Sequence, residues 1–360
     1  MPAVEREAAA ILAMPELTEP VRRVLVPGAR ALAWFEWGRL GDAAASAAAA
    51  AADARRLGFA QHFFAVDSLC TLAGVALEHR DLDTAEKLTE QALSISERRR
   101  RPVFEFLAML DRAGIWTARG HSYEALATVE AARQVLAGTG SILLARADEL
   151  EALIRLSLGD VRAPAELADQ LPADRRALLL ARVALAASDH HTAQQHICSP
   201  SLKGGTKRRA LVRQLLLAAV AITRGDPMTA SLMGSALHTA RQEGFINTVV
   251  TIAPQVTGYL IEHSTEMARD PFTERLITAA LEARAVRPDA TGSRSPMVEP
   301  LTAAELRILK LLPTSSYLQM AATLYISRNT VKTHLRAIYQ KLGVSSRSEA
   351  LERAVELRLL

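Results

Sequence analysis

Aromatic residues are scarce in this sequence of 360 residues. Phe, Trp and Tyr make up only 4% of the chain, and apolar residues recur at spacings of three and four rather than at every second position. That spacing favours helices over strands. The hydrophobic content of 49% is sufficient for a folded core, and a chain of this length has room for roughly two or three structural parts. We therefore expect an all-α protein with essentially no sheet.

Cysteine is scarcer still. Cys70 and Cys198 lie far apart and have neither a CxxC partner nor a Cys/His zinc spacing, so we interpret both as buried thiols in a reducing compartment. The cluster of His190, His191 and His196 lacks further ligands at metal spacing, and we favour a solvated helix start over a metal site. No paired carboxylates, activated nucleophile or phosphate loop stands out. The sequence therefore predicts no enzyme, cofactor or metal.

Long apolar runs are missing as well. No stretch of about 18 uninterrupted apolar residues occurs, which is the length that a membrane helix needs. The N-terminal residues also lack the basic-then-apolar order of a secretion signal. We expect a cytoplasmic protein that does not enter a membrane.

An excess of positive charge is absent from most of the chain. Residues 1–300 contain 34 Lys and Arg against 35 Asp and Glu, whereas residues 301–360 contain nine against four. The excess therefore lies entirely in the C-terminal segment. A small basic domain is typical of proteins that bind DNA, because phosphate contacts release counterions. On charge alone, a merely soluble basic surface is an equal alternative.

A short turn containing Gly-Asp or a similar pair recurs along the first part of the chain. Each turn follows an apolar helical stretch and precedes a more Ala-rich one. One amphipathic helix pair cannot bury its apolar face alone, so such pairs stack into a superhelix with a concave surface. The first members of the pairs, 29 to 40 residues apart, are Gly41, Arg80, Gly120, Gly159, Ser188 and Gly225.

This repeat resembles tetratricopeptide-like repeats, although its period exceeds the usual 34 or so residues. We expect a helical-repeat solenoid over residues 1–286 that senses a ligand or binds a partner. Residues 287–297 are rich in Pro, Gly, Ser and charge and lack an apolar period, which is typical of a linker. A second domain is expected over residues 298–360.

Local signals divide the C-terminal domain into four short helices. A capping box of Thr302 and Glu305 opens the first helix, and Pro313 ends it. The second helix is expected over residues 317–324. Another capping box, within residues 346–349, opens the last helix.

The third helix of this domain is expected over residues 328–342, with Ser327 as its N-cap and Gly343 as its stop. One stripe is apolar and has to pack inward: Val331, Leu335, Ile338 and Leu342. The opposite face carries Asn329, Lys332, Thr333, Arg336 and Gln340. A DNA groove requires long donors that reach base acceptors and short polar groups that allow close approach. A solvated charged helix face has a similar composition.

These four helices resemble the LuxR-type helix-turn-helix. The residues that carry the resemblance are Leu301, Thr302, Glu305, Ile326, Ser327, Asn329, Thr330, Val331, Lys332, Thr333, His334, Lys341, Leu342, Gly343, Val344, Arg347, Glu349 and Ala350. The resemblance implies that the third helix enters the major groove of double-stranded DNA, with Lys332, Thr333 and Arg336 on base edges and with Thr330 and Lys341 among the phosphate contacts. The full candidate DNA-binding set is Ser327, Arg328, Asn329, Thr330, Lys332, Thr333, Arg336 and Lys341. It also implies a homodimer, at least on DNA, through the fourth helix.

The second helix departs from the family pattern Gly-x-Ser/Thr-x-x-Glu-Ile-Ala. Residues 315–321 read Ser-Ser-Tyr-Leu-Gln-Met-Ala, with Gln319 in place of the acidic residue. We expect this change to leave the fold intact. It also permits an alternative function, a helical-repeat interaction scaffold whose helix-turn-helix does not bind DNA productively.

A LuxR-type domain after a helical-repeat region resembles the C-terminal half of the MalT-like regulators, whose repeat region senses an inducer. Their NTPase domain has no counterpart here, because no Walker A sequence occurs. The strand-helix alternation of a phosphorylated receiver and the layout of an acyl-homoserine-lactone sensor are also missing. By analogy we expect the concave face of the solenoid to bind a small molecule, a peptide or a protein, and thereby to regulate transcription.

Overall fold

The computed structural model describes residues 2–138, 143–267, 270–286, 301–344, 346–357 and 359–360. Secondary structure in these ranges is helical throughout, which confirms the all-α prediction. The predicted linker, residues 287–297, lies outside the described residues. No helix in these ranges has the length and apolar character that crossing a membrane requires.

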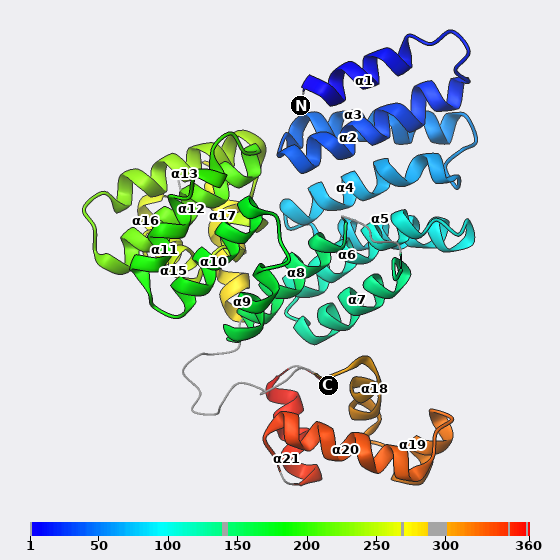
Figure 1. The fold of residues 1–360 in the computed structure, drawn as a ribbon, viewed down its shortest axis with the longest axis vertical. Helices are drawn as coiled ribbons and strands as arrows, with labels where there is room; N and C mark the ends of the chain where they lie inside the picture. Colours follow the sequence, from blue (N-terminus) through cyan, green and yellow to red (C-terminus); the bar gives the residue numbers. More distant parts are fainter. Residues whose placement is uncertain (1, 139–142, 268–269, 287–300, 345, 358) are drawn as a thin grey trace.

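The helices before the C-terminal domain form a stacked array (Figure 1). Its first part contains α1 (Pro2–Leu12), α2 (Val26–Trp37), α3 (Leu40–Arg56), α4 (Val66–Glu78), α5 (Leu82–Arg98), α6 (Pro102–Ala118) and α7 (Ser122–Val135), with a π-helical segment at Val21–Leu25 and a 3-10 segment at Phe63–Ala65. Its second part contains α8 (Leu144–Ser157), α9 (Arg162–Ala168), α10 (Ala173–Ala186), α11 (His190–Ile197), a 3-10 segment at Pro200–Leu202, α12 (Lys207–Arg224), α13 (Thr229–Glu243), α14 (Asn247–Thr251), α15 (Pro254–Glu262), α16 (Ser264–Met267) and α17 (Pro271–Val286).

Helices that follow one another in the sequence pack against each other, as α4 does with α5, α6 with α7, and α12 with α13. Alanines fill many of these contacts, and Ala43, Ala47, Ala85 and Ala125 are fully buried. A methyl group lets two helix axes approach closely. One large core runs through α4 to α8, and another runs through α10 to α17.

Five of the six predicted turns have one common backbone geometry. Arg80, Gly120, Gly159, Ser188 and Gly225 all have positive φ, between 59° and 86°. In each case the amide of this residue donates to the carbonyl three residues earlier, and the next amide donates to the carbonyl five residues earlier. This is the Schellman arrangement, in which backbone groups alone satisfy the last carbonyls of a helix.

The sixth predicted turn was misplaced. Gly41 and Asp42 lie inside the first turn of α3, and the preceding turn is at Gly38, whose φ is +90°. An acidic residue is as favourable in the first turn of a helix as in a loop, because it faces the positive end of the helix dipole. Asp42 also accepts a hydrogen bond from Arg39 at 2.6 Å. The Gly-Asp pair at positions 41 and 42 therefore belongs to a helix start, and the loop lies before it at Gly38.

The cysteine prediction was half wrong. Cys70 is buried in α4, but Cys198 is exposed where α11 ends. His190, His191 and His196 do lie in α11, whose first turn is capped by Asp189. The parts of the chain that the structure describes hold no group of three metal-ligating side chains.

A buried carboxylate joins the two parts of the array. Glu78, at the end of α4, is 5% exposed and accepts hydrogen bonds from the Thr248 hydroxyl at 2.8 Å and the Thr248 amide at 3.1 Å. Arg208 in α12 forms an ion pair with the same carboxylate, and its guanidinium lies 4.9 Å from the ring centroid of Phe35 in α2. Helices far apart in sequence are thus brought side by side.

Two glycines permit this close approach. A Cβ atom at Gly38 would lie 2.7 Å from the Arg208 amide nitrogen, and one at Gly244 would lie 2.7 Å from Nε2 of His79. Both glycines also have positive φ, so only glycine fits. Arg80 adds a further link, with hydrogen bonds to Asn247 at 3.3 Å and to the Ala118 carbonyl at 3.4 Å.

We expect Glu78→Ala to lower the free energy of unfolding by about 2–3 kcal/mol, because it leaves the Arg208 guanidinium and the Thr248 donors without their acceptor. Glu90→Ala, at an exposed position of α5, is the control and should change stability by less than about 0.5 kcal/mol. Urea unfolding followed by circular dichroism measures both. Equal effects of the two substitutions would show that the contacts of Glu78 with Arg208 and Thr248 contribute no stability.

Candidate nucleic-acid interface

The C-terminal helices are α18 (Ala303–Leu311), α19 (Tyr317–Thr323), α20 (Arg328–Leu342) and α21 (Arg347–Glu356), which lie together beside the array (Figure 1). They share a core of their own, formed among others by Leu309, Met320, Val331, Ile338 and Ala354. The four predicted helices are therefore present, and α20 has the predicted bounds.

The predicted capping box of α18 is formed. The Thr302 amide donates to Glu305 at 2.7 Å, and the Glu305 amide donates to the Thr302 hydroxyl at 3.3 Å. The ammonium of Lys341 donates to the same carboxylate at 2.9 Å. Burial opposes ionisation of Glu305, but the hydrogen bonds from Lys341 and Thr302 outweigh it and lower the pKa of this carboxyl. The buried carboxylate thus holds α18 against the end of α20.

The departure in the second helix has a local explanation. Ser316 caps α19, accepting from the Gln319 amide, and the Gln319 side-chain oxygen accepts from the Ser316 amide at 2.7 Å. A capping box needs an acceptor at this position, which Gln supplies as Glu does. The change at Gln319 therefore preserves the start of α19.

The turn between α19 and α20 carries backbone strain. Tyr325 has a φ of +54° and a side chain that is 96% exposed, so no packing compensates for the left-handed conformation. The amide of the next residue, Ile326, donates to Ala321 at 3.0 Å, as in the turns of the array. The turn ends α19 and sets the direction of α20.

Helix α20 has one buried face and one exposed face. The predicted stripe of Val331, Leu335, Ile338 and Leu342 is buried. The exposed residues on the remaining surface include Arg328, Asn329, Lys332, Thr333, Arg336 and Gln340. Within the described ranges, Lys332 and Arg336 have no hydrogen bond or ion pair, so both cations remain available to a partner.

Four of the other predicted site residues take part in local hydrogen bonds through their side chains: Ser327, Thr330, Thr333 and Lys341. The Ser327 hydroxyl caps α20 by accepting from the Thr330 amide at 3.0 Å. Thr333 donates its hydroxyl to the Asn329 carbonyl at 3.0 Å. Lys341 differs most from the others, because its side chain is only 15% exposed and its ammonium already binds Glu305. Seven of the eight predicted residues therefore lie along the first three turns of α20 or at its cap, and Lys341 lies at the far end.

Comparison with known families agrees with this geometry. Residues 299–354 match the family described as bacterial regulatory proteins, luxR family. This segment is a LuxR-family helix-turn-helix domain. The match covers the capping box, the strained turn and the whole of α20.

Two proteins similar to parts of this chain are named as regulators. The chain is 31% identical over 112 residues to "Probable transcriptional regulatory protein NarL" of Mycobacterium tuberculosis, covering 29% of this chain and 50% of that protein. It is 44% identical over 59 residues to "HTH-type transcriptional regulator MalT" of Serratia proteamaculans, covering 16% of this chain and 6% of that protein. The chain thus matches half of the first relative's length and a small part of the second.

Contacts between the LuxR-family domain and the array were not predictable from its motifs. Tyr123 at the start of α7 is 4% exposed and belongs to the core of the LuxR-family domain, and Leu158 after α8 packs against the same core. Burial raises the pKa of Tyr123 to about 12. Lys310 of α18 forms an ion pair with Glu124 of α7 at 3.2 Å. The two parts of the chain share a packed interface.

We expect Tyr325→Gly to stabilise the LuxR-family domain by about 0.5–1 kcal/mol, because glycine adopts positive φ without the steric cost that a Cβ atom imposes. Tyr325→Ala is the matched control, since it removes the exposed ring but keeps the Cβ atom, and it should be nearly neutral. The free energies come from urea unfolding. A glycine variant no more stable than the alanine variant would contradict the assignment of strain.

Proposed function

We propose that this chain is a transcriptional regulator that binds double-stranded DNA by inserting α20 into the major groove. The observation that carries the proposal is the exposed, unpaired cationic face of α20 within a LuxR-family domain. Lys332 and Arg336 are one helical turn apart, so their side chains project from the same face. Such side chains reach guanine acceptors and phosphate oxygens.

Each predicted site residue has a distinct role in this proposal. Lys332, Thr333 and Arg336 contact base edges from the exposed face. Ser327, Arg328, Asn329 and Thr330 lie at the N-terminal end of α20, where free backbone amides and the helix dipole favour a phosphate. Lys341 acts mainly by fixing α20 to Glu305, with which it is paired at 2.9 Å.

Dimerisation on DNA is assigned to α21. Its Val355 side chain is 63% exposed, an apolar surface that a second copy of the helix can cover. A twofold pair of domains would place two copies of α20 about one DNA turn apart, which predicts a pseudo-palindromic site.

We expect the full-length protein to enrich a pseudo-palindromic sequence from a pool of random duplexes. Replacing Lys332 and Arg336 together by Ala should weaken binding of the enriched duplex by on the order of 100-fold, because two base-edge contacts are lost. Electrophoretic mobility shift at fixed salt measures the affinity.

Lys87→Ala with Arg99→Ala is the matched control, since it removes two exposed positive charges from the array. This control should bind the enriched duplex within about two-fold of the unaltered protein, because it leaves α20 intact. Equal losses in both double variants would mean that only general charge matters. Failure to enrich any sequence at low salt would favour the second candidate, an interaction scaffold with a non-productive helix-turn-helix.

We assign regulation to the helical array, residues 1–286, and propose that this array is a tetratricopeptide-like solenoid. In this proposal the linker 287–297 joins the array to the DNA-binding domain 298–360. The array holds a central cavity, and Arg353 and Leu357, from α21 and the residue after it, are among the residues that line it. The docking contact through Tyr123 belongs to the same core as Ala350 and Ala354 of α21, the helix assigned to dimerisation. A ligand in the cavity that loosens this contact would free α21.

We expect Tyr123→Ala to raise affinity for the enriched duplex by about five-fold or more, because it weakens docking and releases α21, and coupling energies of this kind correspond to such factors. Tyr259→Ala is the control, because Tyr259 packs against the core of α10 to α17 and not against the LuxR-family domain. Mobility shift with the same duplex compares the variants. Unchanged or weaker binding by the Tyr123 variant would refute docking as the restraint.

A further inference from the structure

The cavity of the array has a volume of about 1870 Å³ and is bounded by helices from both parts of the array. Much of its wall is apolar, with Leu150, Leu153 and Leu156 from α8 and Leu178 and Leu185 from α10. A cavity of this size exceeds the roughly 300–1,000 Å³ of most small-molecule sites. It can hold an extended apolar molecule.

The polar part of the wall has an excess of positive charge. Among the described lining residues are eight arginines and five carboxylates. Five of these eight arginines have acidic partners: Arg146 pairs with Glu36 at 2.7 Å, Arg175 with Glu149 at 3.0 Å, Arg80 with Glu282 at 3.6 Å, Arg208 with Glu78, and Arg209 with Asp174. In each of these pairs a carboxylate of the protein already balances the charge of the arginine.

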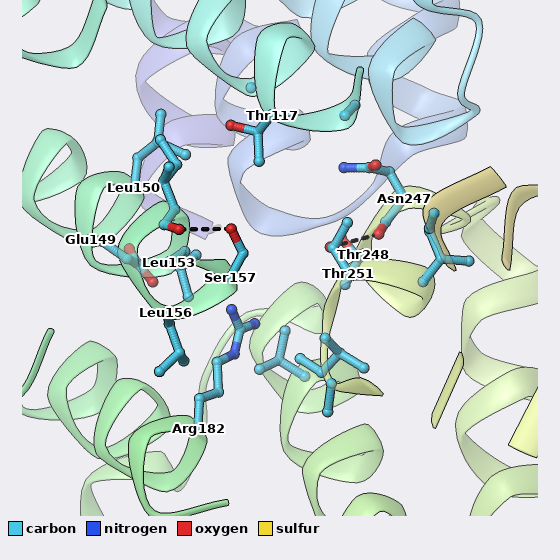
Figure 2. Close-up of a pocket in the computed structure, with 18 of the residues that line it drawn as sticks. Thr117, Glu149, Leu150, Leu153, Leu156, Ser157, Arg182, Asn247, Thr248 and Thr251 are labelled. Atoms are coloured by element: carbon cyan, nitrogen blue, oxygen red, sulfur yellow. Dashed lines mark hydrogen bonds between the residues drawn. The ribbon is translucent and has the colours of Figure 1, made fainter. Parts of the chain in front are cut away.

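Arg182 of α10 differs from these arginines. Its Nε atom is buried without a hydrogen-bond partner, and within the described ranges its guanidinium has no ion pair. Figure 2 shows the Arg182 side chain pointing toward Ser157, which also lines the cavity. Glu149 is the nearby carboxylate, but it is already engaged by Arg175.

Burial lowers the pKa of Arg182 to about 10, while Glu149 raises it. The guanidinium is therefore still protonated at neutral pH, and it is a half-buried cation that has no hydrogen-bonded counterion among the described residues. Such a group is costly to bury alone, and an anion that pairs with it removes that cost.

We propose that the cavity binds an amphiphilic carboxylate, a molecule with an extended apolar body whose carboxylate is held by Arg182. The inference rests on the proposed regulation by the array and names its ligand class. One guanidinium offers two parallel N–H donors that match one carboxylate. The neighbouring Ser157 hydroxyl donates to the Ile154 carbonyl at 2.6 Å and the Thr117 hydroxyl to Ala113 at 2.8 Å, so neither hydroxyl has a proton left for a phosphate dianion.

The position of Arg182 also connects the site to the LuxR-family domain. Ser157, which the guanidinium faces in Figure 2, is the last residue of α8. The next residue, Leu158, packs against the core of the LuxR-family domain. A ligand held at Arg182 would therefore lie next to Ser157, and Ser157 directly precedes Leu158, a residue of the docking contact.

Two fluorescent probes with the same apolar body test the inference. The probe 8-anilinonaphthalene-1-sulfonate carries one negative charge, and N-phenyl-1-naphthylamine carries none. The full-length protein should bind the charged probe more tightly. Arg182→Met keeps the length of the side chain but removes the charge, and it should weaken binding of the charged probe about ten-fold or more while leaving the neutral probe within two-fold. Arg182→Lys should retain an intermediate affinity.

Arg176→Met is the matched control, because Arg176 lies on the same helix, is exposed and is not part of the cavity wall. It should bind both probes as the unaltered protein does. Decanoate should displace the neutral probe at lower concentration than 1-decanol, and this preference should vanish in Arg182→Met. An unchanged affinity of Arg182→Met for the charged probe, or an equal loss for both probes, would overturn the inference. These readouts do not involve DNA, so they stay informative if the proposed regulator fails to select a sequence.

Discussion

The buried contact between Glu78 and Arg208 is the interaction on which the cavity depends. The two residues are 130 positions apart, and they join the end of α4 to the start of α12. Nearby links between the same two parts of the array, such as the hydrogen bond from Arg80 to Asn247, add to this contact. Several groups converge on the same carboxylate, which offsets the cost of removing it from water. The glycines at positions 38 and 244 provide the close approach that this convergence needs.

The LuxR-family domain depends on a different constraint, the ends of its short helices. Each of its four helices begins at a Ser or Thr whose side chain accepts from a backbone amide. Helices of seven to fifteen residues gain little stability from length alone, so these caps and the common core fix their directions. As a result α20 presents one apolar face inward and one cationic face outward. The proposed ligand site in the array and the proposed DNA-binding face on α20 are then separate surfaces, and the docked core around Tyr123 lies between the array and the LuxR-family domain.

A feature could be predicted from the sequence when the residues that form it lie close together along the chain. The bounds of α20 follow from signals within a few residues: the cap at Ser327, the apolar stripe and the stop at Gly343. Five of the six array turns were found for the same reason. Gly41 failed because an Asp after a Gly suits a helix start as well as a loop. Arg182, Tyr123 and Glu78 gave no local signal, since their importance comes from partners brought together only by packing.

The closed arrangement of the array limits how it can change over evolutionary time. An open stack of helix pairs can gain or lose one pair and still present the same kind of surface, because each unit contacts only its neighbours. Here Glu78 meets Arg208 only if the number of intervening pairs, and the rotation that each contributes, bring α4 back to α12. A duplicated or deleted pair would separate the two residues and open the wall. The number of helices between α4 and α12 is therefore fixed by geometry, whereas helices outside this span are free of that constraint.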